Sequence, residues 1–291
     1  MKQLFLVAAI SFATTGFAQK VNNKLTFQKG QKLEMTSKVN TLISMEMMGQ
    51  AMESKLDATV TRLFDVEDAT NNSATIEHKV KRIQMNFEAP MQGAQTFDSD
   101  NEKDMKGDGG KAMEKALKNK YSMTVDANGK ITAVKADDDN PNKAPQKEDA
   151  DMMSNALAQF AAGFDLPETG DTSEFMILPA KELLKGESWT DSSKNVKTVY
   201  TLADVTDADI IVNYTEEASV SRTQEAMGQE ITMTSKDKTT GKITLDKKTG
   251  LLKEKTATTS SQGNMEMAGQ TMPMNTKTTK TVTVKAISPI P

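Results

Sequence analysis

The sequence predicts a mainly β (α+β) protein: a curved antiparallel sheet, or sheets, from two similar hairpin-rich halves with one or two covering helices. Three observations support this. A short phrase containing Gly recurs at residues 45–50, 224–229 and 265–270, with a weaker copy at 89–95. Apolar and polar residues alternate through most of the chain, and an amphipathic helical stretch separates two strand-rich parts.

The recurring phrase predicts hairpin turns. Its glycines form two similarly spaced pairs, Gly49 with Gly93 and Gly228 with Gly269. Glycine gives the backbone the freedom that a tight turn requires. We therefore expect an N-terminal β-rich half at 19–140, a helical connector at 141–170 and a C-terminal β-rich half at 171–291, preceded by a signal peptide at 1–18. One continuous sheet and two separate sheets both fit this division.

Period-two alternation places the strands. One strand face is expected to carry Leu56, Ala58, Val60 and Phe64. The alternation changes parity between residues 76–80 and 83–87, which predicts a β-bulge near Lys81 and Arg82. A last strand at 272–284 has threonines and lysines on one face, as is typical of a solvated antiparallel sheet.

Two helices are expected between the strands. The longer one has an apolar stripe: Met152, Met153, Ala156, Leu157, Phe160, Ala161 and Phe164. Acidic residues precede the stripe, and Pro167 prevents its continuation. A shorter helix at 111–118 would bury Met113 and Leu117. Residues 98–110 and 137–147 are polar and are expected to form loops.

The N-terminus has the features of a secretory signal. Lys2 precedes an apolar run at 4–12, and Gly16 and Ala18 supply the small residues of a cleavage site. The run is far shorter than the roughly 20 residues of a membrane-spanning helix, and no other segment is long and apolar enough to span. We expect a soluble protein, either periplasmic or extracellular. With no cysteine, it must be stable without disulfides.

Composition argues against several partners. The net charge is −4, with lysines and acids interspersed, so the basic face that binds nucleic acid is missing. Aromatic residues make up 5% of the chain, whereas there are 20 methionines. Methionine therefore fills much of the apolar volume, and its flexible thioether suits adaptable surfaces.

No catalytic motif stands out. A Ser–His–Asp site would need His78, the one histidine, which lies in alternating strand sequence. There is no Gly-x-Ser-x-Gly elbow, and residues 107–110 lack the Lys-Ser/Thr of a phosphate-binding loop. The acidic stretches 98–102 and 137–140 lack the Gly and the distal Glu of a calcium loop. We expect no enzyme activity, no cofactor and no metal bound by carboxylates.

The methionine pairs have two interpretations. Met45 with Met47, Met265 with Met267 and Met272 with Met274 could supply thioethers to Cu(I). Alternate strand residues also share one face, so the pairs equally describe an apolar lining, which the periodicity favours. The lone tryptophan, Trp189, either stacks on a ligand or anchors the entry of a strand into the core.

Four short pieces carry a resemblance: Phe27-Gln28-Lys29-Gly30-Gln31, residues 121–131, Leu178-Pro179 through Gly186-Glu187-Ser188-Trp189, and residues 241–252. Together they resemble a family of exported bacterial proteins of unknown function with a Pro…Gly-Asp-Ser-Trp step. Glu187 replaces the expected Asp. The resemblance implies no established activity. The expected fold is also similar to periplasmic lipoprotein carriers of the half-barrel type, an analogy of fold alone.

Our leading hypothesis is a non-catalytic protein that binds an apolar ligand, a lipid or a protein segment, on a methionine-lined sheet face. The candidate binding residues are Met45, Met47, Met265, Met267, Met272, Met274, Phe160, Phe164 and Trp189. A structural or envelope-assembly protein without a ligand, and Cu(I) binding by methionine, are the alternatives.

Overall fold

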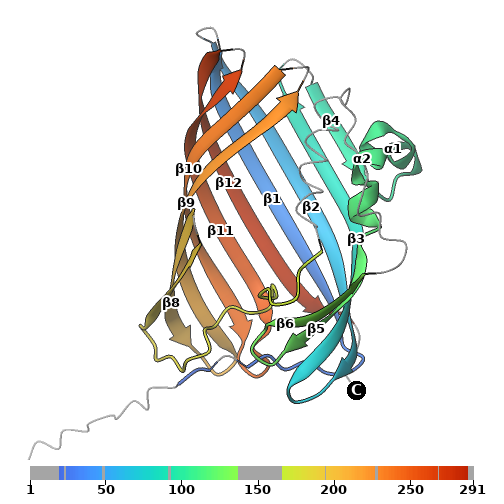
Figure 1. Ribbon diagram of the computed structural model, residues 1–291, viewed down its shortest axis with the longest axis vertical. Coiled ribbons are helices and arrows are strands. Elements are labelled where there is room, and N and C mark those ends of the chain that lie inside the picture. Colours follow the sequence, from blue (N-terminus) through green and yellow to red (C-terminus); the bar gives the residue numbers. More distant parts are fainter. Residues whose placement is uncertain are drawn as a thin grey trace, which may run out of the picture.

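The computed structural model describes residues 20–22, 24–47, 50–90, 93–136, 166–193, 195–226, 229–267 and 269–287. This part of the chain forms one 12-stranded sheet in the order β6-β5-β3-β2-β1-β12-β11-β10-β9-β8-β7, with β4 pairing with β3 (Figure 1). The paired strands are antiparallel. The predicted fold class is confirmed, with one sheet instead of two. The strands are β1 (Lys32–Met47), β2 (Gln50–Ala69), β3 (Ser73–Ala89), β4 (Gly93–Asp98), β5 (Lys120–Asp126), β6 (Ile131–Ala136), β7 (Ser188–Ser193), β8 (Val196–Val205), β9 (Asp209–Ala226), β10 (Gln229–Asp246), β11 (Leu252–Met267) and β12 (Gln270–Ala286).

The two halves of the chain meet at the β1–β12 pair, whose register runs from Leu33 opposite Ala286 to Met45 opposite Met274. The recurring phrases fall at the turns β1–β2, β3–β4, β9–β10 and β11–β12. These turns lie at the same end of the sheet, called here the hairpin end. Gly93 and Gly269 have φ of 68° and 76°, as their turns require.

One face of the sheet, called here the concave face, collects the alternating apolar residues, and the sheet curls toward it (Figure 1). The parity change in β3 is a bulge: Thr61 pairs with Arg82 and Arg62 with Val80, so Lys81 is the extra residue. The predicted bulge is therefore correct, and it keeps Val80 and Ile83 buried. The opposite face is polar, as Asn275, Lys277 and Thr279 on β12 illustrate.

At the end away from the hairpin turns, two irregular segments, 20–31 and 166–187, pack on the concave face. We call this the plugged end. The 166–187 segment crosses it in the yellow part of Figure 1. Its Phe175 is fully buried, with ring centroids 5.4 Å from Phe27 and 5.1 Å from Phe64. Leu178 and Leu183 from the same segment complete this core.

Two short helices, α1 (Glu102–Lys106) and α2 (Asp108–Leu117), lie beside β3 and β4 (Figure 1). The expectation of a loop throughout 98–110 is wrong, because the Asn101 side chain caps α1 by accepting a hydrogen bond from the Lys103 amide. The shorter expected helix is confirmed as α2. It buries Met113 against a cluster that includes Ile83 and Met85, while Leu117 is half-buried.

The longer expected helix, with Phe160 and Phe164, and the expected signal peptide lie outside the described residues. Within the described ranges, no helix is both long and apolar enough to cross a membrane.

Candidate ligand-binding face

Six methionines from five neighbouring strands lie near the hairpin end of the concave face. Met45 on β1 is directly opposite Met52 on β2 and Met274 on β12. Met265 on β11 is directly opposite Met272 on β12 and Met233 on β10. We call these six residues the methionine row. Met272 is buried and the other five are half-buried, so much of their thioether surface still meets solvent.

Four of the predicted site residues are thus brought together: Met45, Met265, Met272 and Met274. Met267 lies one pair nearer the turn, half-buried and opposite Ile231. Met47 pairs with Gln50, and its side chain is outside the described part. Phe160 and Phe164 are outside it as well.

Met52 and Met233 also belong to the row, although they were not among the predicted binding residues. Neither is part of a Met-x-Met pair, the pattern on which that prediction depends. Pairing the strands on either side of the β1–β2 and β10–β11 turns would have identified both residues. The β1–β2 register places Met52 opposite Met45, and the β10–β11 register places Met233 opposite Met265.

Below the methionine row, hydroxyl groups on the concave face pair with neighbouring groups. Thr41 and Thr278 are joined by a hydrogen bond of 3.0 Å, and Thr239 and Thr259 by one of 2.8 Å. Thr198 donates to the Glu216 carboxylate at 3.0 Å. These paired hydroxyls are satisfied within the protein, which lowers the cost of covering them with an apolar group.

An aromatic row crosses the same face one level closer to the plug. Trp189 on β7 stacks on Tyr200 of β8 at 5.1 Å between centroids, and Tyr200 lies 5.8 Å from Tyr214 of β9. Tyr214 covers Gly241 of β10, where an added Cβ would lie 2.3 Å from the Tyr214 ring. Trp189 is half-buried and packs against the main core, so it anchors β7 while keeping one part accessible. Burial, with a smaller effect of Glu216, raises the pKa of Tyr214 to about 12.

Three cationic side chains lie on the same concave face, and one of them, Lys255, contacts the aromatic row. Arg62 on β2 donates to both carboxylate oxygens of Glu174, at 3.1 and 2.6 Å, and so ties the plug to the sheet. Lys255 on β11 places its Nζ 4.9 Å from the centre of the Tyr214 ring. Lys280 on β12 is the third. In the described part of the chain, neither lysine has a carboxylate within salt-bridge distance.

The surroundings lower the pKa of both lysines. Burial lowers the pKa of Lys255, and the neighbouring charge of Lys280 lowers it further. Burial also lowers the pKa of Lys280, followed by the charge of Arg62, while Glu174 opposes the shift. Lys280 is exposed, and it lies on the concave face, opposite Ala257 of β11 and Val39 of β1. Two positive charges that form no ion pair among the described residues therefore lie close together here.

His78 is unsuited to act as a base. It is 2% exposed, stacked at 4.5 Å on Tyr121 and 5.1 Å from Phe64. Burial, followed by the Arg62 charge, lowers the pKa of His78 to about 3. Its ring is therefore neutral and covered. Among the described residues there is also no group of three His, Cys, Asp or Glu side chains placed to hold a metal.

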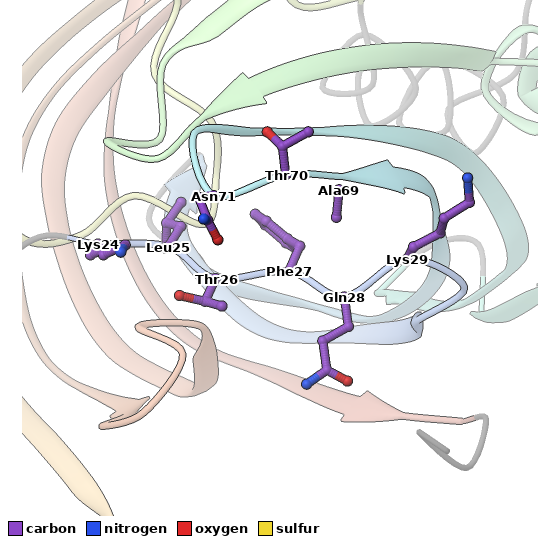
Figure 2. Close-up of a pocket in the computed structure, with 9 residues that line it drawn as sticks. All are labelled: Lys24, Leu25, Thr26, Phe27, Gln28, Lys29, Ala69, Thr70 and Asn71. Atoms are coloured by element: carbon purple, nitrogen blue, oxygen red, sulfur yellow. The ribbon is translucent and has the colours of Figure 1, made fainter.

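A pocket of about 600 Å³ lies at the plugged end, remote from the methionine row (Figure 2). It is lined by residues 24–29 and by 69–71 at the β2–β3 turn. Figure 2 shows Phe27 pointing toward that turn and Gln28 pointing away. Its volume falls within the usual range for ligand pockets, but Lys, Thr, Gln and Asn dominate the lining. This is a poor match for an apolar ligand.

The four sequence pieces that carried the family resemblance have structural roles around the plug. In the 121–131 and 241–252 pieces, Asp126 and Asp246 close their turns by accepting hydrogen bonds from backbone amides. Leu25 donates to the Ala127 carbonyl and Thr26 to the Thr249 carbonyl, so the two turns hold the N-terminal segment between them.

The two remaining pieces fix the ends of the plugging segments. The Gly30 amide donates to the Val66 carbonyl, and the Gly186 amide to the Leu202 carbonyl. Glu187, which replaces the expected Asp, accepts from the Leu184 amide at 2.8 Å and closes the turn before Trp189. The residues that carry the family resemblance therefore hold the plugging segments in place and do not form a binding surface.

Comparison with solved structures finds low similarity. A structure of lipovitellin, described as showing lipid–protein interactions, has a TM-score of 0.48 and 10% identity over 91% of this chain. The chain spans only 26% of the lipovitellin chain. An outer membrane channel from Pseudomonas putida F1 has a TM-score of 0.30 and 7% identity, covering 90% of this chain and 98% of the channel. At these scores neither likeness supports a conclusion about function.

A search of curated proteins found none that matches. The family model described as "Family of unknown function (DUF6263)" matches residues 71–252, well over half of the chain. The matched region runs from the β2–β3 turn to the start of β11. It includes the aromatic row, the 166–187 plug and both Asp turns. On this match, the chain belongs to the DUF6263 family, a family of unknown function.

Proposed function

We propose that the protein is a non-catalytic binding protein that holds an apolar ligand on the concave face of its sheet, against the methionine row. The observation that carries this proposal is the register of five strands, which gathers six methionines on one face and leaves five of them half-exposed.

Solvent exposure of this row is unfavourable unless something covers it. Burying an apolar side chain of this size is worth roughly 1.5–3 kcal/mol when complete, so half-buried methionines retain part of that free energy for a ligand. Their unbranched, polarizable side chains also adapt to ligands of varied shape. The opposite face offers no comparable surface, because threonine, lysine and asparagine occupy it along β12.

A binding role also fits the state of the hydroxyls and of the one histidine among the described residues. The paired hydroxyls contact one another or Glu216, and His78 is buried in the core. Export by the expected signal at residues 1–18 would bring the protein into contact with lipids and proteins of the cell envelope, from which such a ligand would come.

The experiment has two steps. The full chain is purified from its native envelope, and extracted lipid is identified by mass spectrometry. A fluorescent apolar dye is then titrated into the delipidated protein. We expect a saturable site whose affinity falls about tenfold in the double variant Met45→Gln/Met274→Gln, because two polar amides replace apolar contacts.

Leu42→Gln is the matched control. Leu42 is also on β1 but on the opposite face, and it is 41% exposed. It should leave dye binding unchanged. Repeated preparations without lipid, together with the lack of a saturable dye site, would sink the proposal and favour a structural or envelope-assembly role.

Cu(I) binding is the second candidate, favoured by one observation. Met52, Met45 and Met274 are directly opposite one another on three adjacent strands, so three thioethers meet at one level of the face. Equilibrium dialysis with Cu(I) tests it. Binding weaker than micromolar, or binding unchanged in Met45→Gln/Met274→Gln, excludes this candidate.

A further inference from the structure

We propose that Lys255 and Lys280 bind the anionic headgroup of a single-chain amphiphile, whose apolar tail runs along the concave face to the methionine row. This inference rests on the proposed function and names the chemical class of its ligand. The headgroup is a carboxylate or a phosphate, the shared chemistry being a small oxyanion.

The strand register places the two lysines for joint action. Lys255 is opposite Val282 and Lys280 is opposite Ala257, so the lysines are diagonal neighbours on β11 and β12. Diagonal pairs in an antiparallel sheet are about 7–8 Å apart, within reach of long side chains. Both flexible ammonium groups can therefore converge on one oxyanion between them.

Glu216 and Glu174 partly offset the positive charge of the pair, but neither forms an ion pair with Lys255 or Lys280 in the described part of the chain. Glu174 is already occupied by both guanidinium nitrogens of Arg62, and Glu216 accepts a hydrogen bond from Thr198. Burial, followed by the charge of Lys280, lowers the pKa of Lys255, while burial and the charge of Arg62 lower the pKa of Lys280. An anion between the two lysines would offset their positive charges and complete the site.

Lysines on the outer face of the sheet have polar, solvated surroundings. Lys277 is also on β12, yet it stands among Asn275 and Thr279 on the solvated face. Lys255 instead lies over the Tyr214 ring, next to Tyr200 and Trp189. An unpaired lysine is ordinary on a solvated face, whereas two beside an aromatic row on the inner face form a site.

The distance from the lysines to the methionine row is comparable to the length of a single acyl chain. Lys280 and Met274 are six positions apart on β12, a span of about 20 Å at the rise of a strand. A bilayer core of about 30 Å holds two opposed acyl chains, so one chain covers roughly 15 Å. The path between the lysines and the methionine row crosses Thr278, whose hydroxyl is paired with Thr41.

The test compares probes that differ only in their headgroup. Delipidated full chain is titrated with dodecanoate, dodecyl phosphate, dodecanol and inorganic phosphate, and binding is followed by Trp189 fluorescence and by calorimetry. Trp189 is the single tryptophan and lies in the aromatic row that ends at Lys255. We expect both anionic amphiphiles to bind at least tenfold more tightly than dodecanol or phosphate.

The charge-neutral variant Lys255→Gln/Lys280→Gln should lose about tenfold or more of its affinity for dodecanoate and leave dodecanol binding unchanged. Lys277→Gln/Lys242→Gln, on the outer face of β12 and β10, is the matched control and should bind like the parent. Circular dichroism and the urea midpoint confirm that each variant is folded.

Three outcomes would overturn the inference, and they are distinguishable. Equal binding of dodecanol and dodecanoate, unaffected by Lys255→Gln/Lys280→Gln, would leave the apolar site standing and remove the headgroup site. Phosphate binding as tight as dodecyl phosphate would reduce the site to one for a free anion. Failure of all four probes, with no saturable dye site, would overturn the proposed function itself.

Discussion

The plugged end and the hairpin end of the same sheet follow opposite designs. At the plugged end, two irregular segments fill the concave face, and Phe175, Leu183 and Leu202 are at most 1% exposed. At the hairpin end, the same strand faces carry methionines, five of which remain half-exposed. The same strands run through both ends. The two ends therefore differ in the residues on the concave face and in the segments that cover it.

This difference separates stability from binding. The plugged end holds aromatic and aliphatic residues in a single core, together with the turns that bear the family resemblance. The hairpin end has adaptable thioethers and little cover among the described residues. We therefore expect substitutions at the plugged end to lower the free energy of unfolding, and substitutions at the hairpin end to act mainly on binding.

The largest effect is expected for Phe175→Ala. Phe175 is fully buried and contacts the rings of Phe27 and Phe64. We expect the free energy of unfolding to fall by about 3–5 kcal/mol, the usual cost of removing a buried aromatic ring. Urea unfolding followed by Trp189 fluorescence measures it. A cost below about 1 kcal/mol would show that the 166–187 segment does not form part of the core.

Two methionines on one strand sharpen the comparison. Met35 and Met45 lie on the same face of β1, but Met35 is 1% exposed and Met45 is half-buried. Met35→Ala should cost about 2–5 kcal/mol of unfolding free energy, and Met45→Ala about 1 kcal/mol or less. Urea midpoints of both variants decide it. Equal costs would mean that the hairpin end is as firmly packed as the plug.

Acid should weaken the plugged end through His78. The pKa of His78 falls from 6.5 to about 3 on folding. At pH 5 its side chain is therefore protonated in the unfolded chain and neutral in the native chain. Stability is therefore present above pH 6.5 and is lost as the pH falls, by about 2 kcal/mol at pH 5. The free energy of unfolding is measured at pH 7 and pH 5 for the parent and for His78→Phe. The loss between the two pH values should be about 2 kcal/mol smaller in the variant.

The carboxylate of Asp98 titrates in another range. The Arg82 guanidinium lowers the pKa of Asp98 to about 2, so its contribution is lost only below its usual pKa of 3.8. Measurements between pH 5 and 7 therefore isolate the histidine. An unchanged slope in His78→Phe would contradict the assignment.

The smallest contrast concerns two glycines with nearly the same backbone angle. Gly250 has φ of 71°, and an added Cβ would lie 2.6 Å from the Lys24 carbonyl oxygen at the plug. Gly269 has φ of 76° in a hairpin turn, with no atom within 4 Å. Alanine at either position is held in the left-handed backbone region, which lowers the free energy of unfolding by about 1–2 kcal/mol. The clash with Lys24 should make the loss roughly 1–2 kcal/mol larger in Gly250→Ala. Identical urea midpoints would show that the N-terminal segment is not held tightly by the β10–β11 turn.

The candidate face was partly predictable. Strand parity placed Met45, Met265, Met272 and Met274 on common faces, because alternation depends only on local backbone geometry. The union of those faces into one row depends on the pairing of β1 with β12, residues more than 200 positions apart. Lys255 and Lys280 were not selected at all, since their juxtaposition arises from the same distant pairing.

The plug was also beyond sequence reasoning. Residues 166–187 lack regular alternation and helical spacing, so no periodic signal announces that Phe175 is fully buried. The polar stretch 98–110 misled for a related reason. Its charged residues suggested a loop, whereas the Asn101 side chain caps α1 and Met113 packs α2 against the sheet.

The sequence by itself determined the β-rich class, the hairpin turns and the bulge at Lys81, because each depends on neighbouring residues and on the two-residue period of a strand. Only the tertiary structure decided that the halves share one sheet and that two loop segments fill one end of it. It also decided that methionines, lysines and aromatic rings meet on a single face. Those outcomes depend on contacts between distant segments, whose register no local pattern specifies.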